Sequence, residues 1–142
     1  MSWPSVIILA PEGQRSSLEE RMRSFELVPD VVTGDERLHW QGYSYHLDLS
    51  GGILADFEPE ELEQITARIG TPYGVYVSGQ CREAVRVLLG HVLPGFDGLV
   101  DTNHDDILPA HEFLALLSRH PPWDWRRVPR ADLRQNLASG ST

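Results

Sequence analysis

The chain contains 142 residues, of which 41% are hydrophobic and 23% are charged, a balance typical of one folded globular domain. Its 12 arginines stand against 21 acidic residues, and the formal net charge of −9 argues against binding to the phosphate backbone of a nucleic acid. The single cysteine, Cys81, excludes an internal disulfide, and no apolar run approaches the ~18 residues of a membrane span. The short apolar run over residues 6–10 has no basic residue ahead of it, so we expect no signal peptide and a cytoplasmic protein.

Charge is distributed unevenly along the chain. Residues 1–118 hold 7 Arg against 19 Asp and Glu, a net charge of −12, whereas residues 119–142 hold 5 Arg against 2 Asp, a net charge of +3. We therefore expect an acidic globular domain over residues 1–125, followed by a polar, basic C-terminal tail over residues 126–142.

The N-terminal part of the chain predicts a strand followed by a helix. Residues 5–10 form a short run rich in β-branched side chains, which is typical of a buried strand. Ser16 and Ser17 are each followed three residues later by a glutamate, the spacing of a capping box, so we expect a helix over about residues 17–27. A proline within residues 28–30 ends this helix.

An antiparallel meander is expected next. Apolar and polar side chains alternate over residues 43–50, which is the period of a half-buried strand. Leu38 and Trp40 alternate with polar residues in the same way just before it. The turn signal Ser50-Gly51-Gly52 then leads into a further short strand over residues 53–55.

The second half of the chain alternates helices and strands. A helix is expected over residues 58–70, because its first turn is acidic, as the helix dipole favours, and a glycine ends it. Residues 73–78 predict a strand, and an apolar stripe over residues 85–92 predicts the helix that follows. Residues 99–100 predict a short strand, and Pro109 is expected in the first turn of a last helix.

These elements define the expected fold class, which is α/β with α+β as the alternative. We expect a single domain built on a mixed sheet of about five strands with three to four packed helices. The strand–helix–strand order over residues 73–100 predicts some parallel pairing through a right-handed crossover.

Residues 101–112 resemble the calcium loop of the EF-hand family. Oxygen-bearing side chains occupy positions 1, 3 and 5 of the twelve and a glutamate occupies position 12, a spacing that wraps oxygen ligands around one calcium ion. Asp106 stands where the family has a glycine, and a strand rather than a helix is expected before the loop, so a polar strand-to-helix loop is the alternative. The resemblance implies five ligands, which are Asp101, Asn103, Asp105, the Ile107 carbonyl and Glu112.

Two acidic clusters suggest a docking surface for a cationic protein. One lies in the same loop, and the other opens the helix expected after residue 57. The alternative is that both clusters are simply solvated, with the glutamates placed at a helix N-terminus. The residues expected to contact a partner are Asp101, His104, Asp105, Asp106, His111, Glu58, Glu60 and Glu61.

A small enzyme is a further alternative. His46 and Asp48 are expected on one face of a strand, where they could act as an acid–base pair, and Cys81 lies near a helix start. The spacing from Cys81 to Arg86 is one residue short of a phosphatase loop, so we interpret Cys81 as a small packing residue.

Trp123 and Trp125 are either an exposed contact site with their neighbouring arginines or a hydrophobic lid that pins the C-terminal segment to the domain. The lid is favoured, because exposed tryptophans are costly on a monomer.

The stretch from Gly98 to Trp125 resembles small cytoplasmic immunity proteins found beside polymorphic toxins in bacteria. The shared features are a compact acidic body, an Asp-x-Asn-x-Asp-Asp loop that leads into Pro109 and a short helix, and the terminal Trp123-Asp124-Trp125. The resemblance implies a protein without catalytic residues or cofactor that occludes the active site of a cognate toxin, often a basic nuclease. It further implies that acidic side chains take the place of the phosphate substrate, with no direct contact to nucleic acid or membrane.

Overall fold

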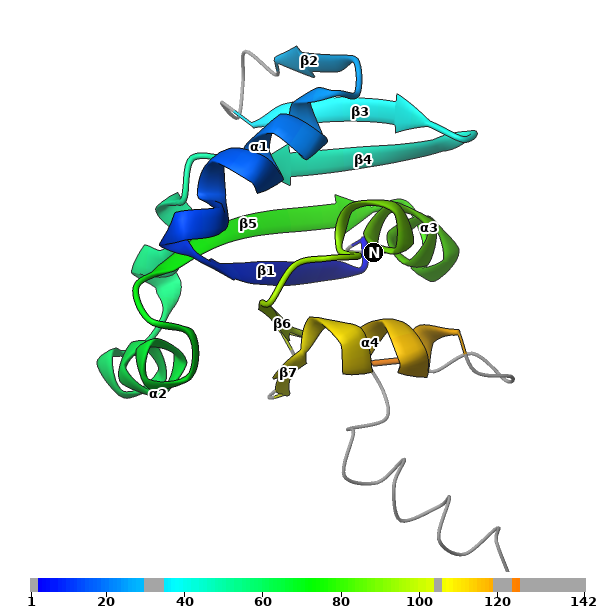
Figure 1. Cartoon of the computed structure of the whole chain (residues 1–142). Helices are drawn as coiled ribbons and strands as arrows, with labels where there is room; N and C mark the ends of the chain where they lie inside the picture. Colours follow the sequence, from blue (N-terminus) through cyan, green and yellow to red (C-terminus); the bar gives the residue numbers. More distant parts are fainter. Residues whose placement is uncertain (1–2, 30–34, 104–105, 119–123, 126–142) are drawn as a thin grey trace, which may run out of the picture.

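A computed structural model describes residues 3–29, 35–103, 106–118 and 124–125 (Figure 1). Within these ranges, no helix combines the length and the apolar character that a bilayer crossing needs. The strands formed by the described residues are β1 (Ser5–Pro11), β2 (Leu27–Pro29), β3 (Glu36–Trp40), β4 (Tyr43–Asp48), β5 (Pro72–Gly79), β6 (Leu99–Asp101) and β7 (Ile107–Pro109). Their helices are α1 (Arg15–Arg23), α2 (Pro59–Ile69), α3 (Arg82–Val92) and α4 (Ala110–Leu117), with the short 3-10 helices η1 (Glu12–Gln14) and η2 (Gly52–Asp56).

The strands form one sheet in the order β2-β3-β4-β5-β1-β6-β7, and every pairing among them is antiparallel. The central pair is β1 with β5, whose register places Ile7 opposite Tyr76 and Ile8 opposite Val75. Branched and aromatic side chains at these positions favour extended backbone, because they pack well on a pleated surface. The combination of one sheet with four helices in the described residues confirms the expected fold class, in its α+β form.

At the centre of the sheet, two pairs of strands alternate, and the two strands of each pair run in the same direction. β1 and β4 both pair with β5, so they run in the same direction on either side of it. β5 and β6 likewise both pair with β1, and α3 connects them. The order β4-β5-β1-β6 is that of a split β-α-β-β-α-β topology. The expected parallel pairing within residues 73–100 is therefore wrong, because β1 lies between the two strands that run in the same direction.

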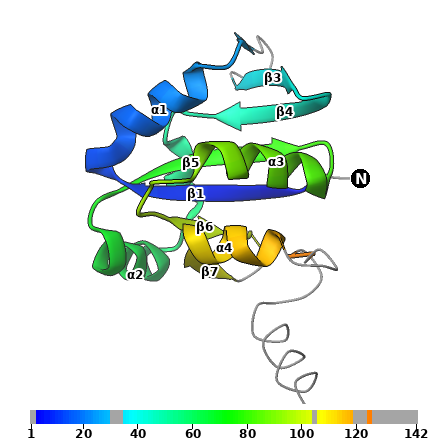
Figure 2. The same cartoon turned by 45° about the vertical axis from the view of Figure 1, so that its right-hand side comes forward.

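Helices α1, α3 and α4 cover one face of the sheet and enclose the larger hydrophobic core (Figure 2). Val6 and Ile8 of β1 point into this core, which also contains Leu88 of α3 and Phe113 of α4. Each of these four side chains is buried, and burial of one such side chain contributes about 1.5–3 kcal/mol. The apolar residues of α3 recur at helical spacing, and the structure buries them in the larger core, as this spacing predicts.

Helix α2 and the 3-10 helix η2 cover only part of the opposite face. Ile65 of α2 packs there against Ile7, Leu9 and Leu99, which alternate along β1 and β6 with residues of the larger core. Over β4, the residues that point to this face are only half-buried, as at His46. This half-covered face leaves room for a groove beside α2.

The sheet has more strands than the five expected from the sequence. The two strands at its edges, β2 and β7, are three residues long and end in Pro29 and Pro109, so they carry no alternating pattern that could reveal them. Residues 53–55, expected as a strand, belong instead to η2. Ile53 and Leu54 pack against the smaller core from this 3-10 turn, which explains why apolar side chains occur there.

Helix α1 also differs from its expected form. It begins at Arg15, with Gln14 as N-cap and no side-chain capping bond, so the predicted capping box at Ser16 and Ser17 is wrong. The helix ends at Arg23 rather than at residue 27, because Leu27 already belongs to β2.

Trp125 is buried, as the hydrophobic-lid interpretation predicts. It is 1% exposed and packs against Phe113, with the two ring centroids 5.7 Å apart. Asp124 beside it lies 3.8 Å from a guanidinium nitrogen of Arg82 on α3. Trp123 and the tail over residues 126–142 lie outside the described residues, so the tail boundary stays a prediction.

Candidate functional site

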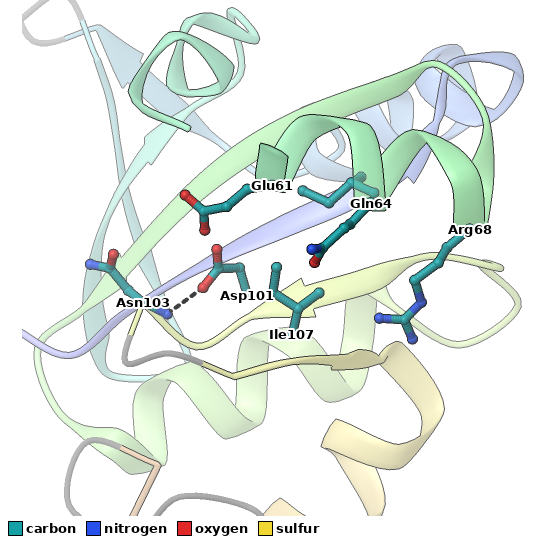
Figure 3. Close-up of a pocket in the computed structure, with 7 residues that line it drawn as sticks. Glu61, Gln64, Arg68, Asp101, Asn103 and Ile107 are labelled. Atoms are coloured by element: carbon teal, nitrogen blue, oxygen red, sulfur yellow. Dashed lines mark hydrogen bonds between the residues drawn. The ribbon is translucent and has the colours of Figure 1, made fainter. Parts of the chain in front are cut away.

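A groove lies between α2 and the β6–β7 hairpin on the half-covered face of the sheet (Figure 3). Its volume is about 420 Å³. A smaller hollow of about 230 Å³ continues from it over η2 and shares three of its lining residues. The groove is lined by Glu61, Gln64, Ile65, Arg68, Asp101, Asn103 and Ile107.

The β6–β7 hairpin supplies one wall of the groove. Leu99 packs in the smaller core and Val100 in the larger one, so Asp101 shares the face of Leu99 and points toward α2. Asp101 is 7% exposed, and its Oδ1 accepts a hydrogen bond of 2.7 Å from the backbone N–H of Asn103. Asn103 has a φ of 63°, a left-handed conformation that asparagine tolerates better than most residues. This local turn fixes the carboxylate of Asp101 at the end of β6.

Helix α2 supplies the opposite wall. The residues that line the groove recur at positions three and four apart and therefore lie on one helical face. Glu61 occupies position N3, where its Oε1 accepts a hydrogen bond of 3.1 Å from the backbone N–H of Glu58. With Glu58 as N-cap and Pro59 at the first helical position, this is a complete capping box. The helix start is thus where the sequence predicts it, and the capping bond holds Glu61 at the mouth of the groove.

Opposite charges occupy the two ends of the groove. The carboxylates of Glu61 and Asp101 point toward one another at one end, and the guanidinium of Arg68 lies at the other (Figure 3). Asp56 adds a third carboxylate in the adjoining hollow. Carboxylates in a hollow attract a cation more strongly than carboxylates in bulk water, because the effective dielectric is lower. This arrangement suits the head of a long cationic side chain.

The groove brings together one member of each predicted acidic cluster, Asp101 and Glu61. Glu58 and Glu60 are exposed on the first turn of α2, beside the groove. These four carboxylates therefore form one acidic surface, which sequence spacing alone cannot show.

The other residues predicted to contact a partner are not part of this groove. His111 is exposed on α4, which packs on the opposite face of the sheet. Asp106 precedes β7, and its carbonyl accepts a hydrogen bond of 2.9 Å from the backbone N–H of Thr102. His104 and Asp105 lie outside the described residues.

The stretch that resembles a calcium loop forms a β-hairpin followed by a helix. Asp101 pairs with Ile107 across the hairpin, and strand β6 stands where the EF-hand family has its first helix. Asp101 points into the groove, whereas Glu112 belongs to α4 on the other face of the sheet. Among the described residues, no three or more His, Cys, Asp or Glu side chains are grouped to hold a metal ion. Because Asp105 lies outside that set, calcium binding stays a prediction.

The residues of the enzyme alternative lie on different sides of the sheet. His46 and Asp48 alternate with Tyr45 and Leu47 of the larger core, so they point to the half-covered face. His46 packs edge-on against Trp3, and Asp48 accepts two hydrogen bonds from Ser50. Cys81 packs against the larger core, which is on the opposite face. The three side chains therefore do not converge on one site.

The charged or amide side chains of Asp56, Gln64 and Arg68 line the groove or its adjoining hollow, but the sequence did not identify them as site residues. A signal for two of them exists, since Gln64 and Arg68 follow Glu61 by three and seven residues on the helical face. Asp56 carries no such signal, because its segment was expected to be a strand.

Comparison of the chain with protein-family models, with curated proteins and with solved structures found no match. The class of this protein is therefore described from its fold and its groove. The chain is a single α+β domain whose half-covered sheet face carries a carboxylate-lined groove.

Proposed function

We propose that this chain is a non-catalytic binding protein that docks a cationic protein partner at the groove between α2 and β6. The observation that carries this proposal is the meeting of Glu61 and Asp101, from two acidic clusters distant in the sequence, in one groove. An arginine or lysine of the partner would place its charged head between these carboxylates and its apolar stem along the half-buried Ile107. The net charge of −9 adds long-range attraction for such a partner.

The partner that fits best is a toxin domain with a basic active site, such as a nuclease, and the chain would act as its cytoplasmic immunity protein. A nuclease holds the phosphates of its substrate with cationic side chains, and the exposed carboxylates of Glu58 and Glu60 could occupy those side chains instead. Electrostatic attraction raises the rate of association, which suits an inhibitor that must capture a toxin before it acts.

The test measures binding of the full chain to the protein encoded by the adjacent reading frame, by calorimetry at about 0.05 M and about 0.5 M salt. Neutralising the acidic surface with Glu60→Gln/Glu61→Gln keeps a glutamine at the capping position and should weaken the affinity about tenfold or more. The matched control is Glu20→Gln/Glu26→Gln, which changes the net charge equally but lies on and just after α1, away from the groove.

The expected result is binding that weakens with salt and that the groove variant impairs while the control variant does not. Equal loss of affinity in both variants would mean that only net charge matters and would overturn the groove as the docking site. Absence of binding by the wild-type chain at both salt concentrations would overturn the proposed partner.

A further inference from the structure

Helix α2 lies on one side of the half-covered sheet face and leaves the other side open. β5 is the middle strand of the sheet, and Ile65 of α2 packs over β1 and β6, on one side of it (Figure 1). On the other side, over β2, β3 and β4, the side chains that point to this face are exposed or half-buried. We call this side the bare half, and it carries Val28, Arg37, His39, Ser44, His46 and Asp48, with Trp3 beside them.

Two large apolar side chains are exposed on the bare half. Val28 is 62% exposed on β2 and lies opposite Arg37 in the strand register. Trp3 is 39% exposed and packs edge-on against His46 of β4. A single exposed apolar side chain is ordinary, but two on one half of a face favour a surface that another protein buries.

The bare half also carries an exposed cation beside a hollow. The hollow has a volume of about 550 Å³ and is lined by Glu26, Leu27, Val28, Arg37 and His39. Arg37 and His39 flank Leu38, which is buried in the larger core, so both point to the bare half. No described carboxylate forms an ion pair with Arg37. Its guanidinium is therefore available to a carboxylate from another molecule.

The outward side of α2 has the opposite charge. Glu60, Glu63 and Ala67 are exposed and follow one another at spacings of three and four residues, so they share one side of the helix. Ile65 and Ile69, on the other side, pack toward the sheet. Helix α2 is therefore a ridge on this face, and two of the side chains along its outward side are carboxylates.

We propose that two copies of this chain pack face to face, with α2 of each copy lying over the bare half of the other. A two-fold axis along the middle strand, β5, exchanges the two halves of the face, so the ridge of one copy covers the open strands of its partner. Glu63 of each copy then meets Arg37 of the other, and Val28 is buried at both ends of the contact. The dimer does not depend on the proposed function.

A second copy fits this face better than an unrelated acidic protein does. Any acidic protein could supply a carboxylate to Arg37, but the contact with a second copy is made twice, because the two-fold axis repeats it. The second copy also has an open half that receives α2 of the first. The net charge of −9 repels the second copy at long range, so we expect a weak dimer.

The test measures the mass of the full chain by sedimentation from about 10 μM to about 1 mM, since a weak dimer forms only as the concentration rises. The wild type should change from one chain to two over this range. Arg37→Glu alone places two glutamates at each contact, and Glu63→Arg alone places two arginines there. Each variant should weaken the dimer about tenfold or more, because like charges then face one another.

An equal mixture of the two variants tests the pairing itself. In a mixed dimer, the new glutamate of one copy meets the new arginine of the other, and the native Glu63 meets the native Arg37. The mixture should therefore dimerise as the wild type does, and so should a chain that carries both changes. Glu20→Arg is the matched control, because it changes the charge as Glu63→Arg does but lies on α1, on the opposite face, and it should not weaken the dimer.

Each other outcome would overturn the proposal. A wild-type chain that sediments as one chain up to about 1 mM would exclude the dimer. A dimer that both charge reversals leave unchanged would use a different surface. Reversals that weaken the dimer without recovery in the mixture would exclude the contact between Arg37 and Glu63. The measurement contains no other protein, and neither residue lines the groove, so its failure leaves the proposed function standing. A partner titration that fails likewise leaves the dimer standing.

Discussion

Trp125 and Ser5 connect a segment late in the sequence to the first strand of the sheet, through an indole hydrogen bond of 3.4 Å to the serine carbonyl. The same indole ring packs on Phe113 of α4 within the larger core. One side chain therefore closes the core at the end of the sheet where β1 begins.

Replacing Trp125 with alanine should destabilise the domain by about 3–5 kcal/mol, because it removes a fully buried aromatic side chain and leaves a cavity beside Phe113. The free energy of unfolding from urea denaturation measures the effect. Trp3→Ala is the matched control, since Trp3 is 39% exposed and contacts His46 at the surface, and it should cost less than about 1 kcal/mol. Equal losses in the two variants would contradict the role of Trp125 in closing the core.

Gly98 should not tolerate a side chain. A Cβ at this position would lie 2.5 Å from the carbonyl oxygen of Leu9, a backbone atom of the central strand that cannot move aside cheaply. We expect Gly98→Ala to destabilise by about 1–3 kcal/mol in urea denaturation, as overpacking does. Gly90→Ala is the control, because nothing lies within 4 Å of a Cβ there and alanine favours the interior of α3, so it should stabilise by about 0.5–1 kcal/mol. A neutral Gly98→Ala would mean that β1 and the segment before β6 are less closely packed.

Elements with a strong pattern of their own could be predicted from the sequence. The apolar run of β1, the alternation of β4 and the stripe of α3 each identify one element, because their burial depends on local spacing. β2 and β7 could not be found, because three residues ending in a proline carry no period and become strands only by pairing with β3 and β6. The same limit explains the wrong expectation for residues 53–55, where apolar side chains serve a 3-10 turn.

The site is less accessible to prediction than the fold. The acidic residues themselves were identified, but their meeting depends on the pairing of β6 with β1 and on the placement of α2 on that face of the sheet. The sequence around Glu61 does not reveal that Asp101 lines the same groove, because the two residues are brought together only by the tertiary fold. The separation of His46 from Cys81 has the same origin, because it depends on which face of the sheet each side chain reaches.

The stability of the domain should fall at alkaline pH through its buried tyrosines. The hydroxyl of Tyr45 donates a hydrogen bond of 2.6 Å to the carbonyl of Ala84, and burial raises the pKa of Tyr45 well above its ordinary value of 10.0. Tyr73, which is buried and bonded to the carbonyl of Leu49, has its pKa raised mainly by burial as well. Above pH 10 the unfolded phenols lose their protons while the folded ones retain them, so the unfolded state gains stability as the pH rises.

Replacing Tyr45 with phenylalanine tests this account. The variant should lose about 0.5–1.5 kcal/mol at neutral pH with the hydrogen bond to Ala84, and its free energy of unfolding should fall less steeply between pH 10 and higher pH than that of the wild type. Urea denaturation at a series of pH values measures both effects. A slope identical to the wild-type slope would show that Tyr45 does not titrate differently in the two states.

Cys81 should behave as a replaceable helix cap rather than as a reactive group. It is the N-cap of α3, with the extended backbone that this position requires, but its side chain makes no capping hydrogen bond. Cys81→Ser introduces a capping oxygen and should stabilise the domain by about 0.5–1 kcal/mol relative to Cys81→Ala, which has the same backbone but no acceptor. Both variants should bind the cationic partner as the wild type does, because Cys81 packs against the larger core on the face opposite the groove. Loss of function in Cys81→Ser with an unchanged free energy of unfolding would instead favour the enzyme alternative, since it would separate the thiol from its packing role.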